Sequence, residues 1–104
     1  MRRVHDYFDI SGKTALITGA GGLLGPKHAE ALIECGAKVV LTDHHEDRAL
    51  EKAAQLNKTY GRNSATAHYM DVTNKSSIQE VFSRYNEISI LVNNAAKDPK
   101  VKKG

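Results

Sequence analysis

The sequence predicts an α/β domain built on one parallel sheet, and three observations lead to this prediction. Short apolar runs stand between longer segments whose apolar residues recur every three or four positions. Strand-like and helix-like segments alternate without exception, which requires crossover connections and therefore parallel strands. A turn dense in glycine follows the first strand-like run. In domains of this class, such a turn lies where ligands bind.

The first strand and the glycine turn are the clearest local features. Residues 14–18 are apolar and contain neither glycine nor proline, so we expect a buried strand there. Four glycines come next, at Gly19, Gly21, Gly22 and Gly25. The order strand, turn, helix directs free backbone N–H groups toward an anion, and glycines let a phosphate approach the backbone. The flanking strand and helix favour a dinucleotide site over a connector that binds nothing.

A helix is predicted over residues 24–35. Its repeating positions, which we expect to face the core, are Leu24, His28, Ala31, Leu32 and Cys35. Pro26 falls in the first turn, where its missing N–H removes no helical hydrogen bond. Gly36 is expected to end the helix. This pattern makes His28 a packed histidine rather than a ligand, and the single cysteine a core residue rather than a nucleophile.

The second strand and the second helix follow directly. Residues 38–42 form the strand, which closes at Asp43, and residues 46–60 form the helix, which stops at Gly61. The helix face that we expect to be buried carries Leu50, Ala53, Ala54 and Asn57.

The last elements repeat this order. Residues 64–70 form a third strand, and either Thr73 or Asn74 caps a third helix. The apolar stripe of that helix is Ile78, Val81, Phe82 and Tyr85. Residues 88–92 form a fourth strand, which would lie at an open edge of the sheet.

These elements predict a Rossmann-type, doubly wound sheet with strand order 3-2-1-4. Right-handed crossovers place the first two helices on one face and the third on the other. The reversal between strands one and four opens a crevice at their carboxyl ends, beside the glycine turn. We therefore expect a lead-in segment over residues 1–13, an incomplete dinucleotide-binding domain over 14–96, and a basic tail or truncation point at 97–104.

Asp43 is the candidate for recognising a ribose. A carboxylate at the end of the second strand accepts hydrogen bonds from both ribose hydroxyls and repels a 2′-phosphate, so NAD is favoured over NADP. The alternative is that Asp43 caps the following helix. The nearby cations His44, His45 and Arg48 weaken the preference for NAD. A metal site at residues 44–47 is not expected, because consecutive residues match no common ligand spacing.

The glycine turn resembles that of the short-chain dehydrogenase/reductase family, usually written T-G-x-x-x-G-x-G. Thr18, Gly19 and Gly25 match this pattern, while Leu23 stands where the middle glycine belongs. The spacing through Gly22 is nearer to the extended branch of the family, T-G-x-x-G-x-x-G. The resemblance implies that the chain is the N-terminal, cofactor-binding half of such an enzyme, with the C-terminal half of the fold missing.

The resemblance also assigns roles near the ends of the third and fourth strands. It implies that Asp71 approaches the adenine amino group and that Val72 packs near the ring. The run from Asn93 to Ala96 resembles the family motif N-N-A-G, in which the first Asn steadies the sheet and the small residues admit the cofactor. The full set of expected cofactor-binding residues is Thr18, Gly19, Gly21, Gly22, Leu23, Leu24, Gly25, Asp43, Asp71, Val72, Asn93, Ala95 and Ala96.

Catalysis in the family depends on a Tyr-x-x-x-Lys pair with a Ser ahead of it, and none of the tyrosines here has Lys four residues later. We therefore name no catalytic residue. The expected function is the cofactor half of an NAD-dependent oxidoreductase acting on a small alcohol or carbonyl substrate. This chain alone is expected to bind cofactor weakly, to associate and not to turn over. The alternatives are a sugar-nucleotide epimerase or dehydratase of the extended branch, and a catalytically inactive nucleotide-binding module.

The composition of the chain limits the kinds of partner that it is expected to bind. The net charge of +3 arises in the last eight residues, since the other 96 carry 11 basic and 11 acidic side chains. A basic face for nucleic acid is therefore not expected. No apolar run approaches the roughly 18 residues of a membrane helix, and no signal peptide is evident. A single cysteine suits the cytoplasm, and the family implies a homo-oligomer for the full-length protein.

Overall fold

The computed structural model describes residues 10–22, 24–85 and 87–94 of the chain. Most of the expected lead-in segment, including Phe8, lies outside the described residues, as does the expected basic tail. Within the described ranges, no helix combines the length and the apolar character needed to cross a bilayer.

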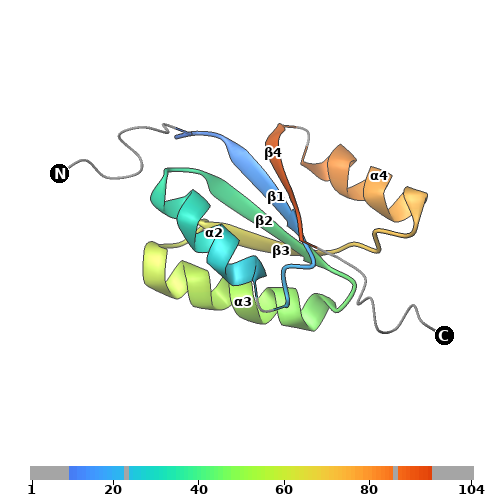
Figure 1. Cartoon of the computed structure of the whole chain (residues 1–104), viewed down its shortest axis with the longest axis horizontal. Coiled ribbons are helices and arrows are strands. Elements are labelled where there is room, and N and C mark those ends of the chain that lie inside the picture. The colour runs from blue at the N-terminus through green and yellow to red at the C-terminus, as the bar shows by residue number, and fades with distance from the viewer. Residues whose placement is uncertain (1–9, 23, 86, 95–104) are drawn as a thin grey trace.

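The described strands form one parallel sheet. They are β1 (Thr14–Thr18), β2 (Lys38–Asp43), β3 (Ala65–Tyr69) and β4 (Ile88–Asn93). Their order is β3-β2-β1-β4, which confirms the predicted order 3-2-1-4. All the arrowheads point toward the same side of the molecule, so the carboxyl ends of the strands meet at one edge (Figure 1).

The helices cover the two faces of the sheet as predicted. The helix α2 (Gly25–Glu34) packs on β1 and β2, and α3 (Glu46–Tyr60) packs on β2 and β3. On the opposite face, α4 (Lys75–Arg84) lies alone among the described helices (Figure 1). The sheet is therefore doubly wound, with the reversal of direction between β1 and β4.

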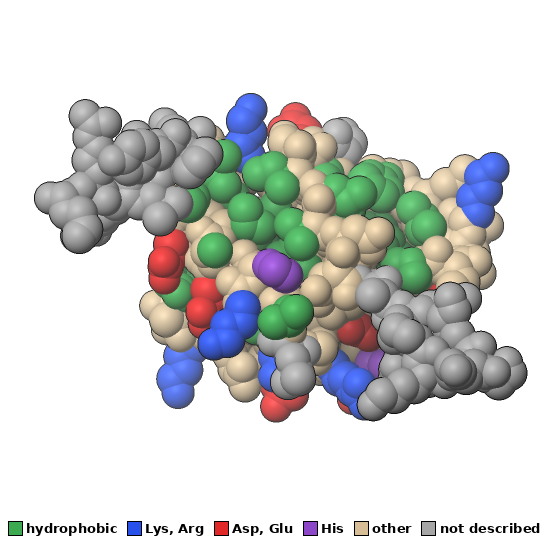
Figure 2. Space-filling model, viewed as in Figure 1, with side chains coloured by type: hydrophobic (Ala, Val, Ile, Leu, Met, Phe, Trp, Pro, Cys, Tyr) green, Lys and Arg blue, Asp and Glu red, His purple; other side chains and the backbone are tan. Residues whose placement is uncertain are grey.

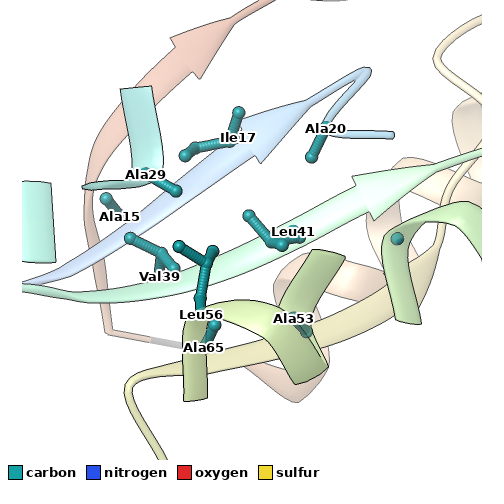
Figure 3. Close-up of a cluster of buried hydrophobic side chains, with 10 residues drawn as sticks. Ala15, Ile17, Ala20, Ala29, Val39, Leu41, Ala53, Leu56 and Ala65 are labelled. Carbon is teal, nitrogen blue, oxygen red and sulfur yellow. The ribbon is translucent and has the colours of Figure 1, made fainter. Parts of the chain in front are cut away.

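Small residues dominate the core between the sheet and the pair α2 and α3. Figure 3 shows this cluster, in which Val39 and Leu41 of β2 lie against Leu56 of α3. More than half of its buried members are alanines, which let the helices approach the sheet closely. The buried members are Ala15, Ile17, Ala20, Ala29, Val39, Leu41, Ala49, Ala53, Leu56 and Ala65.

A smaller core lies under α4. Leu16 and Val40 of the sheet meet Met70 and Val81, and all four are buried. The expected stripe of α4 is confirmed at Val81, with the flanking residues Ile78 and Tyr85 partly buried. Phe82 at its margin stays 39% exposed. One helix therefore covers only part of this face.

The buried face of α2 matches the predicted one at Leu32, which packs against the core, but differs at three other positions. Leu24 is 59% exposed, and His28 and Ala31 are exposed as well. Gly25 and Ala29 face the core instead, one position further along the helix. The reason is the close approach of α2 to the turn: only small residues fit where the helix passes Ala20. His28 is therefore not a packed core histidine, whereas Cys35 is buried as expected.

The buried face of α3 matches the prediction only in part, since Ala53 is buried as expected whereas Ala54 is exposed. The bounds of the helix match the prediction, but its buried residues are Ala49, Ala53 and Leu56, while Leu50 is 53% exposed. Asn57 does not fill the core. Its side-chain amide donates to the carbonyl of Ala65 and accepts from the N–H of the same residue, both at 2.8 Å. This pair of hydrogen bonds fixes the start of β3 beside α3.

Two of the predicted helix ends have clear physical causes. At the end of α2, Gly36 has φ 101°, and Gly36 and Ala37 donate to the carbonyls of Ile33 and Leu32 at 2.9 and 3.0 Å. This is the Schellman arrangement, which favours glycine at the left-handed position. At the start of α4, the side chain of Asn74 accepts from Ser77 N–H at 3.1 Å. Of the two expected caps, Asn74 is therefore the one used.

Replacing this cap should weaken the fold modestly. Asn74→Ala leaves the Ser77 N–H without its acceptor, so we expect the free energy of unfolding to fall by about 1 kcal/mol. Asn74→Ser keeps an acceptor at the same position and should retain most of the stability. Urea denaturation of the three proteins measures the difference. Equal stability of wild type and Asn74→Ala would show that the cap contributes nothing.

The strand β4 lies at the edge of the described sheet, as predicted. Its side chains alternate between half-buried and exposed positions, and Leu91 is 59% exposed. Figure 2 shows hydrophobic side chains gathered on the side of the molecule where β1, β4 and α4 lie, while charged side chains gather around α3.

Candidate cofactor site

The turn between β1 and α2 is shaped by a left-handed glycine and by hydrogen bonds to its neighbours. Gly19 has φ 61°, a conformation that suits glycine. Ala20 N–H donates to the carbonyl of Thr42 at 2.9 Å, and Gly22 N–H donates to the carbonyl of Gly19 at 3.2 Å. The cap residue Leu24 contributes no side-chain acceptor to the first turn of α2. The helix N-terminus therefore remains suited to receive an anion.

Two of the glycines are required by close packing. A Cβ on Gly25 would lie 2.6 Å from the Cα of Ala20 and 2.7 Å from its carbonyl oxygen. A Cβ on Gly21 would lie 2.6 Å from the Cβ of Arg48 and 2.9 Å from Asp43 Oδ2. The corresponding position on Gly22 meets nothing nearer than 3.4 Å. The turn is thus pressed between α2 on one side and the end of β2 on the other.

Asp43 joins the turn to the end of β2. Its carboxylate is 8% exposed, and Oδ2 accepts from Gly21 N–H at 2.8 Å. The other oxygen, Oδ1, accepts from His45 N–H at 2.8 Å. The N-cap residue of α3 is His45, so Asp43 supports the bend before the helix without occupying the cap position itself. A buried carboxylate with two such donors is held in one orientation.

The ends of β1 and β4 are joined by hydrogen bonds between side chains and backbone. The Thr18 hydroxyl donates to Asn93 Oδ1 at 3.0 Å and accepts from Asn94 N–H at 2.9 Å. The Asn94 side chain donates to the carbonyl of Gly19 at 3.3 Å. These bonds fix the position of β4 relative to the glycine turn. They lie at the reversal of the sheet, where a crevice was expected.

Asp71 follows β3 and closes a small turn. Its Oδ1 accepts from the hydroxyl of Thr73 at 2.7 Å and from Thr73 N–H at 2.9 Å. Asp71 N–H donates to the hydroxyl of Ser77 in α4 at 2.9 Å. The hydrogen bond from the Thr73 hydroxyl, followed by the one from its N–H, lowers the pKa of Asp71 below the ordinary value for Asp. The carboxylate is therefore charged at neutral pH and remains an acceptor.

Removing the Thr73 hydroxyl should raise the pKa of Asp71. In Thr73→Val only the backbone donor remains, so the pKa should move back toward the ordinary value. Because the folded-state pKa is lowered, the stability that Asp71 contributes is present above the ordinary Asp pKa and lost as the pH falls through the lowered value. NMR titration of the Asp71 carboxyl carbon measures this. Thr59→Val on α3 is the control, and an unchanged Asp71 pKa in Thr73→Val would contradict the assignment.

A cavity of about 780 Å³ opens at this edge of the sheet. Six of the residues that the sequence singled out line it: Gly19, Gly22, Leu24, Asp43, Asp71 and Val72. Thr18 and Asn93 stand beside it through their hydrogen bonds, and Gly21 lines a neighbouring cavity of about 410 Å³. Gly25 lies beneath the turn, in direct contact with the backbone of Ala20. Leu23, Ala95 and Ala96 lie outside the described residues.

Four lining residues were not predicted: Tyr69, Met70, Thr73 and Asn94. Each lies at the carboxyl end of a strand or in the turn after it, and the sheet topology brings those ends to one edge. Each also lies within two residues of Asp71 or Asn93 in the sequence, and this proximity could have identified them as lining residues. Tyr69 and Val72 are 43% and 41% exposed and supply apolar surface for a flat ring.

The charges around the cavity are of both signs. Asp43 and Asp71 stand near the basic side chains His44, His45 and Arg48, all of which line the same cavity. Both imidazole rings lie beside the Asp43 carboxylate, with Nδ1 to Oδ1 distances of 3.6 Å for His44 and 3.5 Å for His45. The cavity can therefore accept hydroxyl groups and also tolerate an anionic group at its rim.

Among the described tyrosines, Tyr60 of α3 is hydrogen-bonded to a carboxylate of α2. Its hydroxyl donates to Glu34 Oε2 at 2.8 Å, and this hydrogen bond raises the pKa of Tyr60 to about 12. A tyrosine that exchanges a proton near neutral pH requires a shift in the opposite direction. Tyr60 is therefore not a candidate for such an exchange.

The sequence matches the model of the short chain dehydrogenase family over residues 13–103. It is 40% identical over 91 residues to a short chain dehydrogenase/reductase of Gibberella zeae, covering 84% of this chain and 33% of that protein. It is also 40% identical over 91 residues to a sorbitol dehydrogenase of Cereibacter sphaeroides, covering 84% of this chain and 34% of that enzyme. The chain therefore spans about a third of the length of these curated relatives.

Solved structures show the same fold. The RhlG protein of Pseudomonas aeruginosa, solved as a complex with NADP, matches with a TM-score of 0.78 and 29% identity over 93% of this chain and 40% of that one. A protein described as a D-mannonate oxidoreductase of Haemophilus influenza, solved with bound NAD, matches with a TM-score of 0.77 and 26% identity. That match covers 94% of this chain and 36% of the other. The two neighbours thus hold different dinucleotides.

Proposed function

The chain belongs to the short chain dehydrogenase family, and from this premise we propose that it is the cofactor-binding part of an NAD-dependent oxidoreductase. The reaction is hydride transfer between the nicotinamide ring and a small alcohol or carbonyl substrate. One observation carries the proposal. The cavity at the carboxyl edge of the sheet has the glycine turn on one side and the buried Asp43 on the other.

In this proposal, the pyrophosphate lies at the N-terminus of α2. The first turn of α2 offers backbone N–H groups because Leu24 supplies no side-chain cap, and the helix dipole favours negative charge there. The exposed side chain of Leu24 would cover the cofactor from the solvent side. Leu23 is included in the proposed pyrophosphate site because of its position in the family motif.

Asp43 is proposed to recognise the adenosine ribose. Each of its oxygens already accepts one backbone N–H, and a carboxylate has about four acceptor sites, so two ribose hydroxyls can still donate to it. The charged Asp71 would accept from the adenine amino group, and the exposed Val72 would pack on the ring. Asn93, Ala95 and Ala96 are proposed to line the nicotinamide side, as the family motif implies.

NAD is proposed over NADP because a 2′-phosphate would meet the charge of Asp43. The Asp43 carboxylate is held in place by Gly21 and His45, so it cannot turn away from the phosphate. The Arg48 guanidinium at the rim reduces this repulsion because it lines the same cavity, and His44 and His45 there can offer N–H donors. We therefore expect a preference for NAD and not a complete exclusion of NADP.

A binding titration tests the proposal. NADH fluorescence should change saturably as the chain is added, and NADPH should bind at least about tenfold more weakly because of the like charges. ADP-ribose should displace NADH, because the described residues recognise the adenosine and pyrophosphate part. Tighter binding of NADPH would refute the assigned cofactor. Lack of saturable NADH binding up to about millimolar concentration would refute the site itself.

The chain as given is proposed to bind without turnover. Hydride transfer in this family requires a proton-exchanging tyrosine, and no Tyr-x-x-x-Lys pair occurs in the sequence. Mixing the chain with NADH and carbonyl compounds should therefore give no loss of absorbance at the nicotinamide band. Measurable turnover would show that another group in this chain performs the proton transfer.

A further inference from the structure

The bend between β2 and α3 brings three potential metal ligands together. Asp43, His44 and His45 each place one ligand atom within 4.8 Å of the other two. These residues are consecutive, and the extended backbone of a strand would direct neighbouring side chains to opposite sides. Here the strand ends at Asp43, and His45 is the N-cap of α3 with φ −102° and ψ 87°. The chain reverses at this bend, and both imidazole rings turn back toward the carboxylate.

The distances fit a small transition-metal ion. The Nδ1 atoms of His44 and His45 lie 3.6 and 3.5 Å from Asp43 Oδ1. Ligand atoms at the corners of a tetrahedral zinc site lie about 3.3–3.5 Å apart, because Zn–N and Zn–O bonds are about 2.0–2.2 Å long. The ligand nitrogens of the two rings lie within 4.8 Å of each other, and the ring centroids are 3.9 Å apart.

The Asp43 carboxylate is already fixed in position without a bound ion. Asp43 is 8% exposed and is held by hydrogen bonds from Gly21 N–H and His45 N–H, so it does not have to be ordered by the ion. The imidazoles are 66% and 45% exposed, which lets an ion reach them from solvent. The acidic residues Glu46 and Asp47 in the first turn of α3 offset the positive charge of Arg48.

We propose that Asp43, His44 and His45 form a binding site for a divalent transition-metal ion of the Zn²⁺, Co²⁺ or Ni²⁺ class. Two imidazole nitrogens and one carboxylate oxygen suit these ions, whereas Mg²⁺ and Ca²⁺ prefer sets of oxygen ligands. This function is distinct from the proposed dehydrogenase role. The fourth coordination position would face the cavity, since all three residues line it.

The site overlaps the proposed ribose site at Asp43. An ion bound at Oδ1 would take up acceptor capacity that the ribose hydroxyls need. Zn²⁺ and NADH should therefore compete for the chain. This consequence rests on the proposed function, whereas metal binding in the absence of nucleotide does not.

Metal titration of the nucleotide-free chain tests the site. Calorimetry with Zn²⁺, and the visible absorption of Co²⁺, should show one ion per chain, with no binding of Mg²⁺ under the same conditions. His44→Ala and His45→Ala should each weaken Zn²⁺ binding by at least about tenfold, since even a supporting group contributes on that scale. His28→Ala removes an exposed histidine of α2 and should bind Zn²⁺ as the wild type does.

The outcomes separate the two proposals. Zn²⁺ affinity unchanged in both His44→Ala and His45→Ala would overturn the metal site, and so would an equal loss in His28→Ala. Binding of NADH that is insensitive to bound Zn²⁺ would overturn the overlap with the ribose site. If NADH does not bind at all, the dehydrogenase proposal fails, and the Zn²⁺ titration still decides the metal site.

Discussion

Replacing Gly25 by alanine is expected to lower the free energy of unfolding by about 3 kcal/mol or more, the upper range for overpacking a close contact. The new Cβ would lie 2.6–2.9 Å from the Cα, carbonyl carbon and carbonyl oxygen of Ala20. These are backbone atoms of a turn whose N–H is bonded to Thr42, so no side chain can swing aside to relieve the contact. The start of α2 would have to move away from the sheet.

Gly22→Ala is the matched control in the same turn. Its Cβ would approach only the carbonyl oxygen of Gly19, at 3.4 Å, and Gly22 does not have a positive φ. We expect its stability to stay within about 1 kcal/mol of the wild type. Urea denaturation followed by circular dichroism measures both variants. A Gly25→Ala protein as stable as Gly22→Ala would show that the turn is free to shift. The close contact between Gly25 and Ala20 would then not be required for stability.

The variant Asp43→Asn is expected to weaken NADH binding by about 10- to 100-fold, which corresponds to the loss of one or two hydrogen bonds to a charged group. The amide nitrogen cannot accept from a ribose hydroxyl. It would also face an N–H donor, either that of Gly21 or that of His45, because both carboxylate oxygens are engaged. We expect the free energy of unfolding to fall by about 1–3 kcal/mol for the same reason.

Asp47→Asn provides the comparison for charge alone. Asp47 is exposed in the first turn of α3, four residues after Asp43, and its loss changes the net charge by the same amount. NADH affinity should be nearly unchanged in this variant, because surface charges are screened by salt. Fluorescence titration of both proteins at one ionic strength separates the two effects. Equal affinities in Asp43→Asn and in the wild type would remove Asp43 from the proposed site.

The architecture could be predicted from the sequence because each element carries its own signal. The apolar run at residues 14–18 matches β1, and the acidic start and glycine stop at 46 and 61 match α3. Strand order followed from alternation and crossover handedness, which leave few topologies open. These signals are local or general to the fold class. They do not depend on how side chains interlock.

The faces of α2 and α3 could be predicted only in part, because small residues carry many of their contacts. Ala29 and Ala49 are as buried as any residue of the chain, while the larger Leu24 and Leu50 remain exposed. A pattern based on side-chain size favours leucine, but the close approach at Gly25 admits only small side chains. The face is therefore set by the distance between helix and sheet, which the sequence does not display.

The site was predicted where it follows the strand ends, and missed where it depends on the shape of the turns. Asp43 was named because it closes the second strand, and Asp71 because of the family resemblance at the end of the third. The approach of His44 and His45 to the same carboxylate was not expected, since spacing rules for metal sites assume regular helices or knuckles. The bend before α3 brings them together, and bends of this kind have no periodic signature.

The most direct test of the account is an NMR titration of the isotope-labelled chain with NAD. If the proposed site is correct, the largest changes in backbone amide shifts should fall on the turn from Gly19 to Gly25 and on residues 43–45, with smaller changes at Asp71 and Val72. The amides of α4 away from Asp71, such as Phe82, should stay in place. Shifts centred on α4 or on the exposed edge of β4, with the glycine turn unchanged, would contradict the assignment of this cavity to the cofactor.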